Sequence, residues 1–130
     1  MTKQRISTPE APAALGPYSQ GVASGNLLFV SGQTPIDPAT GALVAGSIEE
    51  STRQVIKNIR AILQAAGADL EHVLKTTVFL TDMGNFKRMN AVYAEFFTGT
   101  PPARSTIQVS ALPMNAEVEI EAIAKLPEKA

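Results

Sequence analysis

Two helical patterns stand out in the order of hydrophobic and polar residues along the chain. Ser47 and Glu50 have the spacing of a capping box, and the apolar positions after them return with the period of one helical face until Gly67. Those apolar positions are Ile48, Val55, Ile59, Ile62, Leu63 and Ala66. A second helical pattern runs over residues 85–97 and closes at Gly99. The sequence therefore predicts two helices.

Shorter segments have the period of strands. Six are predicted, at about residues 5–7, 20–24, 27–30, 73–80, 105–109 and 117–124. In the last segment Val118, Ile120, Ala122 and Ala124 point one way, whereas Glu117, Glu119 and Glu121 point the other way. Gly25-Asn26 predicts a hairpin turn, and residues 35–46 are expected to form a loop.

The order β-β-β-α-β-α-β-β predicts one α+β domain over residues 1–130, a six-stranded mixed sheet with both helices on one face. A hairpin across Pro113-Met114 would place Arg104 opposite residues 119–122. The segments 27–30 and 73–80 are apolar enough for burial on both faces, and no third helix is available to cover the second face. We therefore expect a homo-oligomer with pockets at its subunit boundaries.

Composition excludes several classes of function. Eleven basic and twelve acidic residues, with no basic cluster, argue against nucleic-acid binding and membrane-surface binding. The chain has no cysteine and a single histidine, His72, which we interpret as a solvated loop residue, so we expect no metal centre and no Ser-His-Asp triad. The absence of an apolar leader or spanning segment predicts a cytoplasmic protein.

Arg104 is the first candidate for chemistry. Pro101 and Pro102 stiffen the backbone before it, so its planar guanidinium is suited to anchor a carboxylate or phosphate. An ordinary ion pair or an interface contact is the alternative for an isolated arginine. Tyr18 lies in a tight turn between Gly16 and Gly21, either as a half-buried aromatic with a wet hydroxyl or as a donor to substrate.

Three further positions have two interpretations each. Ser31-Gly32 follows an apolar strand, where the glycine allows a ligand to approach the backbone or forms a plain turn. Asn90 interrupts the apolar side of the second helix, so its amide either ties down a loop or faces a pocket. The three glutamates of the last strand form a solvated face or contribute a carboxylate to a site.

The chain resembles the RidA subfamily of the reactive intermediate deaminases, the YjgF-like family. The resemblance rests on several ordered motifs: residues 13–21, Ser31-Gly32-Gln33, residues 75–80, Asn90-Ala91-Val92-Tyr93 with Phe96-Phe97, residues 102–105 and residues 118–124. It implies a chorismate-mutase-like fold that assembles as a homotrimer around a central barrel, with one cleft at each of three interfaces. It also implies a 2-iminobutanoate/2-iminopropanoate deaminase that needs no cofactor.

The resemblance assigns roles to residues. It implies that Arg104 anchors the substrate carboxylate, that Glu119 and Tyr18 are cleft residues, and that Ser31, Gly32 and Asn90 line the cleft. Thr106 stands where some relatives carry a cysteine, and its backbone carbonyl is expected to help Glu119 hold the attacking water. The expected reaction hydrolyses imines such as the tautomer of 2-aminoacrylate to 2-oxo acids and ammonia. The alternative is a non-catalytic ligand-binding trimer that acts as a sensor, chaperone or translation regulator.

Overall fold

In the computed structural model, which describes residues 2–128, both helices begin and end close to their sequence signals. Helix α1 spans Ile48–Ala65, and the Ser47 hydroxyl accepts a hydrogen bond from the Glu50 N–H at 3.2 Å. Gly67 follows with φ of 84°, a conformation that suits glycine at a helix C-terminus. Helix α2 spans Phe86–Phe96. The two predicted helices are confirmed.

The main sheet has six strands in the order β1-β2-β3-β8-β6-β7. Their bounds are β1 Gln4–Ile6, β2 Gly21–Ser24, β3 Leu27–Gln33, β6 Val73–Leu80, β7 Ala103–Gln108 and β8 Val118–Lys125. Only β6 and β7 run parallel, and every other neighbouring pair is antiparallel. The predicted six-stranded mixed sheet is therefore confirmed.

The predicted hairpin between the Arg104 strand and the last strand is wrong. Strand β6 separates β7 from β8, and it pairs with both of them. Helix α2 connects β6 to β7, and such a crossover places the second strand parallel and adjacent to the first. The position of β8 between β3 and β6 then leaves β7 at the edge of the sheet.

The expected loop over residues 35–46 contains a small two-stranded sheet, β4 Ile36–Asp37 with β5 Ala42–Leu43. Three short 3-10 helices lie at Leu70–His72, Met83–Asn85 and Pro113–Asn115. The interpretation of His72 as a solvated loop residue is wrong, because its Nδ1 accepts a hydrogen bond from the Asp69 N–H at 3.0 Å and caps the first of these helices.

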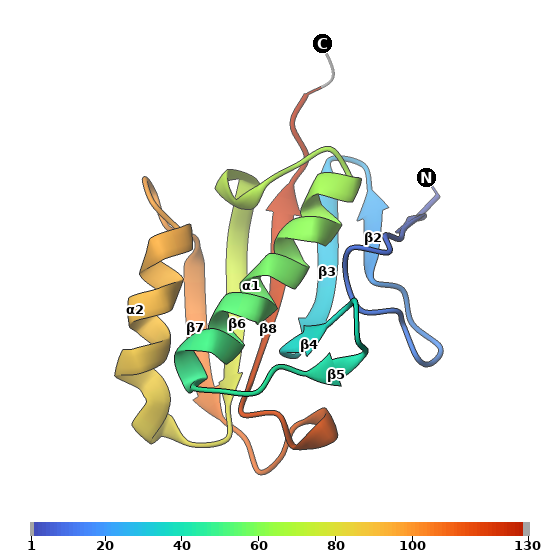
Figure 1. The fold of residues 1–130 in the computed structure, drawn as a ribbon. Helices are drawn as coiled ribbons and strands as arrows, with labels where there is room; N and C mark the ends of the chain where they lie inside the picture. Colours follow the sequence, from blue (N-terminus) through green and yellow to red (C-terminus); the bar gives the residue numbers. More distant parts are fainter. Residues whose placement is uncertain (1, 129–130) are drawn as a thin grey trace.

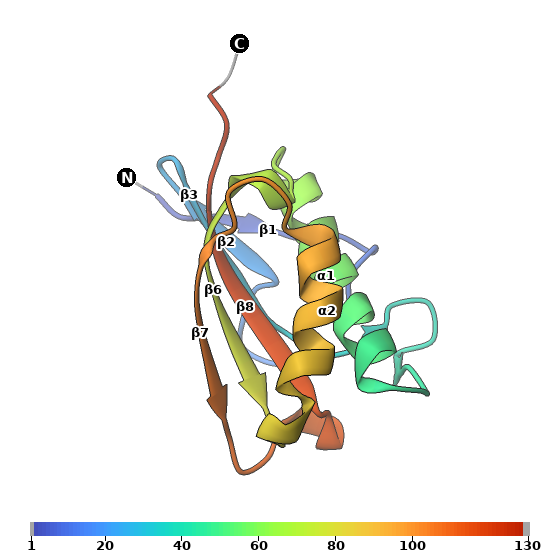
Figure 2. The same cartoon turned by 90° about the vertical axis from the view of Figure 1, so that its left-hand side faces the viewer.

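Both helices cover the same face of the main sheet (Figures 1 and 2). The core lies between these two layers, where Leu28, Val78 and Ile120 from three strands are fully buried against α1 and α2. Val118, Ile120, Ala122 and Ala124 are all buried, as the alternation of β8 predicts. No helix in residues 2–128 is long and apolar enough to cross a membrane.

The opposite face of the sheet has no covering layer among the described residues (Figure 2). It exposes large apolar side chains from three strands: Phe29 is 46% exposed, Leu74 is 50% exposed and Ile107 is 45% exposed. Within one chain β3 and β6 are thus buried on the helix face alone, not on both faces as their composition predicts. We call this surface the bare face.

Candidate functional site

Arg104 lies near the start of β7, the edge strand, and stands opposite Thr76 of β6 in the register of the two strands. Its guanidinium lies 4.7 Å from the ring centroid of Tyr93 and 5.6 Å from that of Phe86, both on α2. No carboxylate in residues 2–128 forms an ion pair with it. Aromatic faces attract the cation but leave its hydrogen-bond donors free, so Arg104 can receive an anion.

Tyr93 is itself held in place. Its hydroxyl lies 2.7 Å from Thr76 Oγ1, and both groups are buried. Burial raises the pKa of Tyr93 above its ordinary value, which outweighs the opposing effects of the Thr76 hydrogen bond and the Arg104 charge, so the phenol stays protonated. Because Thr76 pairs with Arg104 across the two strands, the tyrosine ring and the guanidinium are positioned by the same rung of the sheet.

A cavity of about 340 Å³ opens beside this cation. Its lining is formed by Asn90, Tyr93, Ala94, Phe97, Pro101, Pro102 and Arg104. Of the two interpretations of Asn90, the structure supports the pocket. Asn90 Oδ1 is buried without a hydrogen-bond partner in the described chain, and so is Thr106 Oγ1 on the same strand as Arg104. Buried polar atoms without partners are rare in proteins, so both oxygens remain available as hydrogen-bond acceptors, and Asn90 lines the cavity beside Arg104.

Glu119 lies on β8 with its side chain on the bare face, and it is half-buried. A Cβ added to Gly32 of β3 would collide with its Oε2, so the glycine leaves room for the carboxylate to lie against the backbone. Burial raises the pKa of Glu119 above its ordinary value, and the nearby Glu121 carboxylate raises it further. Gly32 thus accommodates a protein carboxylate, and it does so from within the strand, not from a turn.

Ser31, the residue before Gly32, is hydrogen-bonded to the loop that carries Tyr18. The Ser31 hydroxyl donates to the Ser19 carbonyl at 2.5 Å, and its N–H donates to the Gln20 carbonyl at 2.9 Å. Tyr18, next to Ser19, is 54% exposed. A second group of candidate residues, separate from the group around Arg104, therefore consists of Glu119, Gly32, Ser31 and Tyr18.

The two groups lie on opposite faces of the sheet. Arg104 pairs with Thr76, whereas Glu119 pairs with Phe79, which in turn pairs with Ile107. Paired residues share a face and neighbours along a strand alternate, so the three-residue step from Arg104 to Ile107 reverses the face. Within one chain a single small molecule therefore cannot contact both Arg104 and Glu119.

Sequence reasoning did not identify Phe86 and Tyr93 as partners of Arg104. They lie seven residues apart, two turns along the inner side of α2, which the periodicity interprets as core. Their alignment with the guanidinium depends on how α2 packs over β7. An aromatic pair at this spacing, combined with an arginine on the following strand, is the signal that would have indicated it.

The chain matches a family model described as endoribonuclease L-PSP over residues 8–126. It is 52% identical over 124 residues to a protein of Arabidopsis thaliana named reactive intermediate deaminase A, chloroplastic, and the match covers 95% of this chain and 66% of that protein. It is 50% identical over 119 residues to a mouse protein named 2-iminobutanoate/2-iminopropanoate deaminase, with coverage of 92% and 88%. Other similar proteins are named only as RutC family proteins.

Solved structures show the same fold. The crystal structure of Escherichia coli TdcF with bound serine superposes with a TM-score of 0.92 at 42% identity, and the match covers 95% of this chain and 99% of that one. All the candidate residues, from Tyr18 to Glu119, lie inside the matched family region.

Proposed function

The chain belongs to the endoribonuclease L-PSP family, the YjgF-like family that includes reactive intermediate deaminases, and from that premise we propose that it hydrolyses short 2-imino acids to 2-oxo acids and ammonia. The observation that carries the proposal is that Arg104, which has no acidic partner in residues 2–128, lies beside a cavity of small-molecule size. Such a cation is suited to bind the carboxylate that all 2-imino acids carry. The serine bound by TdcF, a relative of the same fold, carries the same group.

The proposed active site is assembled from two copies of the chain, in a homotrimer. Three features support this assembly. The bare face exposes Phe29, Leu74 and Ile107, β7 is an open sheet edge, and the Arg104 and Glu119 groups face opposite ways. If the β7 edge of one copy lies against the bare face of the next, Arg104 of the first meets Glu119 of the second, and closed symmetry repeats that contact at each interface.

The backbone of β7 is suited to the same contact. Val109 N–H donates to the Leu80 carbonyl at 2.8 Å, so residues 105, 107 and 109 direct their backbone groups toward β6. Backbone groups alternate sides along a strand, so those of Arg104 and Thr106 point to the open edge. In the proposed site the Thr106 carbonyl accepts a hydrogen bond from the attacking water, a role in which the threonine side chain takes no part.

The proposed reaction needs one proton carrier and one anchor. Arg104 holds the carboxylate and orients the C=N carbon, while Glu119 of the neighbouring copy accepts a proton from the water as its oxygen bonds to that carbon. Glu119 returns this proton to the nitrogen, which completes the neutral carbinolamine. A second proton then passes from the new hydroxyl group, by way of Glu119, to the nitrogen. The C=O bond forms as the C–N bond breaks, and the 2-oxo acid and ammonia leave. The raised pKa of Glu119 favours this exchange, because a carboxyl closer to neutrality both takes and returns a proton readily. The cleft around the substrate would be lined by Asn90, Ser31, Gly32 and Tyr18.

The name of the family model suggests ribonuclease activity as another function. No feature of the described residues favours it: they contain no cluster of three or more potential metal ligands, and the single histidine caps a 3-10 helix. The net charge of −1 is also unlike the basic surface of most RNA-binding proteins. A sensor without catalysis would use Arg104 in the same way, so activity has to be measured directly.

A coupled assay tests the proposal. A pyridoxal-phosphate dehydratase acting on serine generates 2-aminoacrylate, and loss of the imine is followed with the wild-type chain, Arg104→Ala and Glu119→Ala. We expect acceleration by the wild type, loss of acceleration in both variants with the fold retained, and no change in Arg53→Ala, an arginine paired with Glu95 on the helical surface. Ligand binding without any acceleration would favour the sensor and reject the enzyme.

A further inference from the structure

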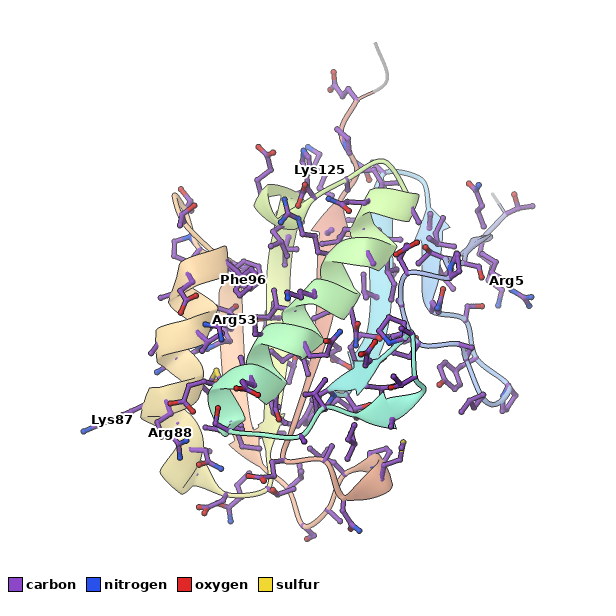
Figure 3. All side chains as sticks on the ribbon, viewed as in Figure 1. Arg5, Arg53, Lys87, Arg88, Phe96 and Lys125 are labelled. Atoms are coloured by element: carbon purple, nitrogen blue, oxygen red, sulfur yellow. The ribbon has the colours of Figure 1, made fainter. Side chains whose placement is uncertain are left out.

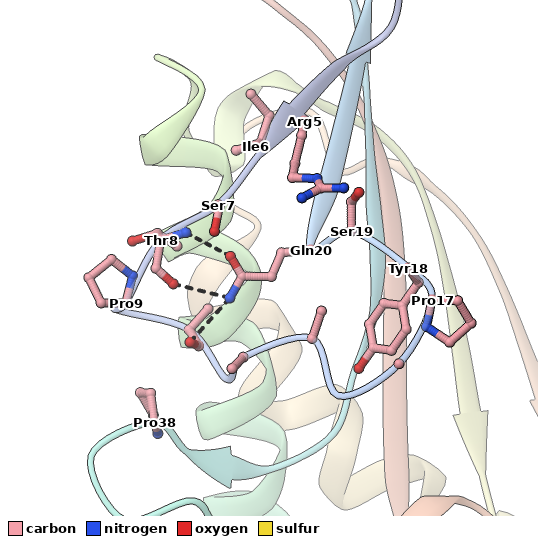
Figure 4. Close-up of a pocket in the computed structure, with 14 residues that line it drawn as sticks. Arg5, Ile6, Ser7, Thr8, Pro9, Pro17, Tyr18, Ser19, Gln20 and Pro38 are labelled. Carbon is pink, nitrogen blue, oxygen red and sulfur yellow. Dashed lines mark hydrogen bonds between the residues drawn. The ribbon is translucent and has the colours of Figure 1, made fainter.

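A second cavity, of about 790 Å³, lies between β1 and the loop that leads to β2. Its lining comes from one continuous stretch, residues 5–20, with Pro38 added from the β4–β5 region (Figure 4). It is larger than the cavity beside Arg104, and its size is in the range of small-molecule sites. Apart from Tyr18 it shares no residue with the proposed active site.

The wall of this cavity is preorganised by one buried side chain. Gln20 Oε1 accepts a hydrogen bond from the Thr8 N–H at 2.7 Å, and its Nε2 donates to the carbonyls of Thr8, Ala11 and Pro12 at 3.1, 3.2 and 2.7 Å. These bonds, several of which Figure 4 shows as dashed lines, tie the loop at Thr8, Ala11 and Pro12 to the Gln20 side chain. A wall that is already ordered loses little entropy when a ligand binds.

Among the described residues that line the cavity, Arg5 alone is charged. Arg53, Arg60 and Arg88 each pair with a carboxylate, and Arg104 contacts aromatic rings, whereas Arg5 has no such partner within residues 2–128. Figure 3 shows Arg5 at the N-terminal side of the sheet, away from Arg53 and Arg88 of the helical layer. In Figure 4 its guanidinium projects from β1 toward Ser19. Arg5 is exposed, so the cavity carries at its solvent-facing side a positive charge without an ion-pair partner in residues 2–128.

The remainder of the lining is mixed. Ser7, Thr8, Ser19 and Tyr18 supply hydroxyl groups. The apolar part of the lining consists of the buried Ile6 and Ala11 and of Pro9, Ala13, Ala14, Pro17 and Pro38. A guanidinium beside hydroxyls matches a carboxylate, and an apolar wall of this size matches a short aliphatic body. We propose that this cavity is a second binding site, specific for a small aliphatic carboxylate whose carboxyl group is held by Arg5.

The second site is connected to the proposed active site at two points. Tyr18 lines the cavity directly, and the Ser19 carbonyl accepts the hydrogen bond from Ser31. A carboxylate in the cavity would therefore contact the loop segment that presents Tyr18 to the cleft. Binding at Arg5 does not depend on the proposed catalysis, since none of its contacts involves Arg104 or Glu119.

The test uses the assembled protein carrying Arg104→Gln, which removes the other unpaired arginine. 4-Methylpentanoate is titrated while the amide NMR signals of Ser7 and Ser19 are followed. We expect saturable shifts, a Kd raised about tenfold or more by adding Arg5→Gln, and an intermediate Kd with Arg5→Lys, which keeps the charge but loses the planar fork. Lys3→Gln is the matched control, because it removes one charge nearby without lining the cavity, and it should leave Kd unchanged.

Other outcomes would overturn the proposal. Absence of saturable binding, a Kd unaffected by Arg5→Gln, or equal weakening by Lys3→Gln would show that Arg5 holds no carboxylate. Equal binding of the neutral 4-methylpentanamide or of inorganic phosphate would reject a site for aliphatic carboxylates. Because Arg104 is already replaced, these results are independent of whether the wild-type chain is a deaminase.

Discussion

The guanidinium of Arg104 lies 4.7 Å from the ring centroid of Tyr93, and the hydroxyl of that tyrosine lies 2.7 Å from Thr76 Oγ1. The cation that would anchor the substrate is thus oriented by an aromatic face, and not by a carboxylate. A carboxylate partner would compete with the substrate for the same hydrogen-bond donors. An aromatic partner fixes the position of the guanidinium and leaves those donors free.

This relationship predicts how Tyr93 variants behave. Tyr93→Leu removes the ring, and the lost cation–π contact of about 1 kcal/mol should raise KM for a 2-imino acid about fivefold, with a smaller effect on kcat. Tyr93→Phe keeps the ring and should retain most of that affinity. It should lower the free energy of unfolding by about 1 kcal/mol, because the buried Thr76 hydroxyl loses its hydrogen-bond partner. Steady-state kinetics and urea unfolding separate the two effects. Phe96→Leu, on the same helix, is the control for loss of an aromatic side chain, and equal KM values for all variants would contradict the role.

Mixing two inactive variants tests whether the site is shared between copies. Co-refolded Arg104→Ala and Glu119→Ala chains should recover activity, because an interface formed by Arg104 of one chain and Glu119 of the other is intact. An interface is active only when its Arg104 comes from a Glu119→Ala chain and its Glu119 comes from an Arg104→Ala chain. In trimers assembled at random from equal amounts this happens at about one interface in four, so the mixture should regain about a quarter of wild-type activity. Each variant refolded alone is the control. An inactive mixture that still forms mixed oligomers would reject the two-copy site.

The bare face should be required for assembly. Ile107→Lys places a charge among the exposed apolar side chains of this face, and burying an unpaired ammonium is costly, so oligomers should dissociate and activity should fall with them. Light scattering measures the mass. Gln64→Lys adds the same charge at an exposed position at the end of α1 and should leave the mass unchanged. A wild-type chain that is monomeric from the start would contradict this prediction.

Glu119 should make stability depend on pH. Its native pKa is raised above the ordinary 4.5, so the folded state holds the proton more tightly than the unfolded state does. Stability is then lost as pH rises from about 4.5 through the raised native pKa, and Glu119→Gln, which cannot ionise, should avoid that loss. Denaturant unfolding should show Glu119→Gln more stable than wild type at pH 7.5, with the difference vanishing near pH 4. Glu10→Gln, an exposed site, is the control; an equal difference at both pH values would contradict the assignment.

Gly32 and Glu119 should show energetic coupling. Gly32→Ala adds a Cβ where the carboxylate lies, and it should destabilise the wild-type chain by about 1–3 kcal/mol as the side chain is displaced. In a Glu119→Ala background the same substitution has nothing to displace and should be almost neutral. Urea unfolding of the four proteins completes the double-mutant cycle. Additive effects would mean that Gly32 is needed for another reason.

The local parts of this fold were predictable because their signals are local. Ser47 and Gly67 mark the ends of α1, and the alternation of β8 separates its buried side from its glutamates. The pairing of β7 was not predictable in the same way, because a hairpin and a crossover past α2 are both compatible with the strand pattern. Long-range pairing depends on where α2 packs, and no residue near Arg104 encodes that position.

The sequence by itself determined the two helices, the strand periods, the bare second face and the residue types available for chemistry, since each of these follows from spacing or composition. Only the tertiary structure decided that Arg104 lies against Tyr93, that Glu119 lies against Gly32, and that the two side chains are on opposite faces of the sheet. The physical reason is the two-residue period of a strand. Which face a side chain occupies relative to another strand depends on register, and register is set by packing across the whole domain.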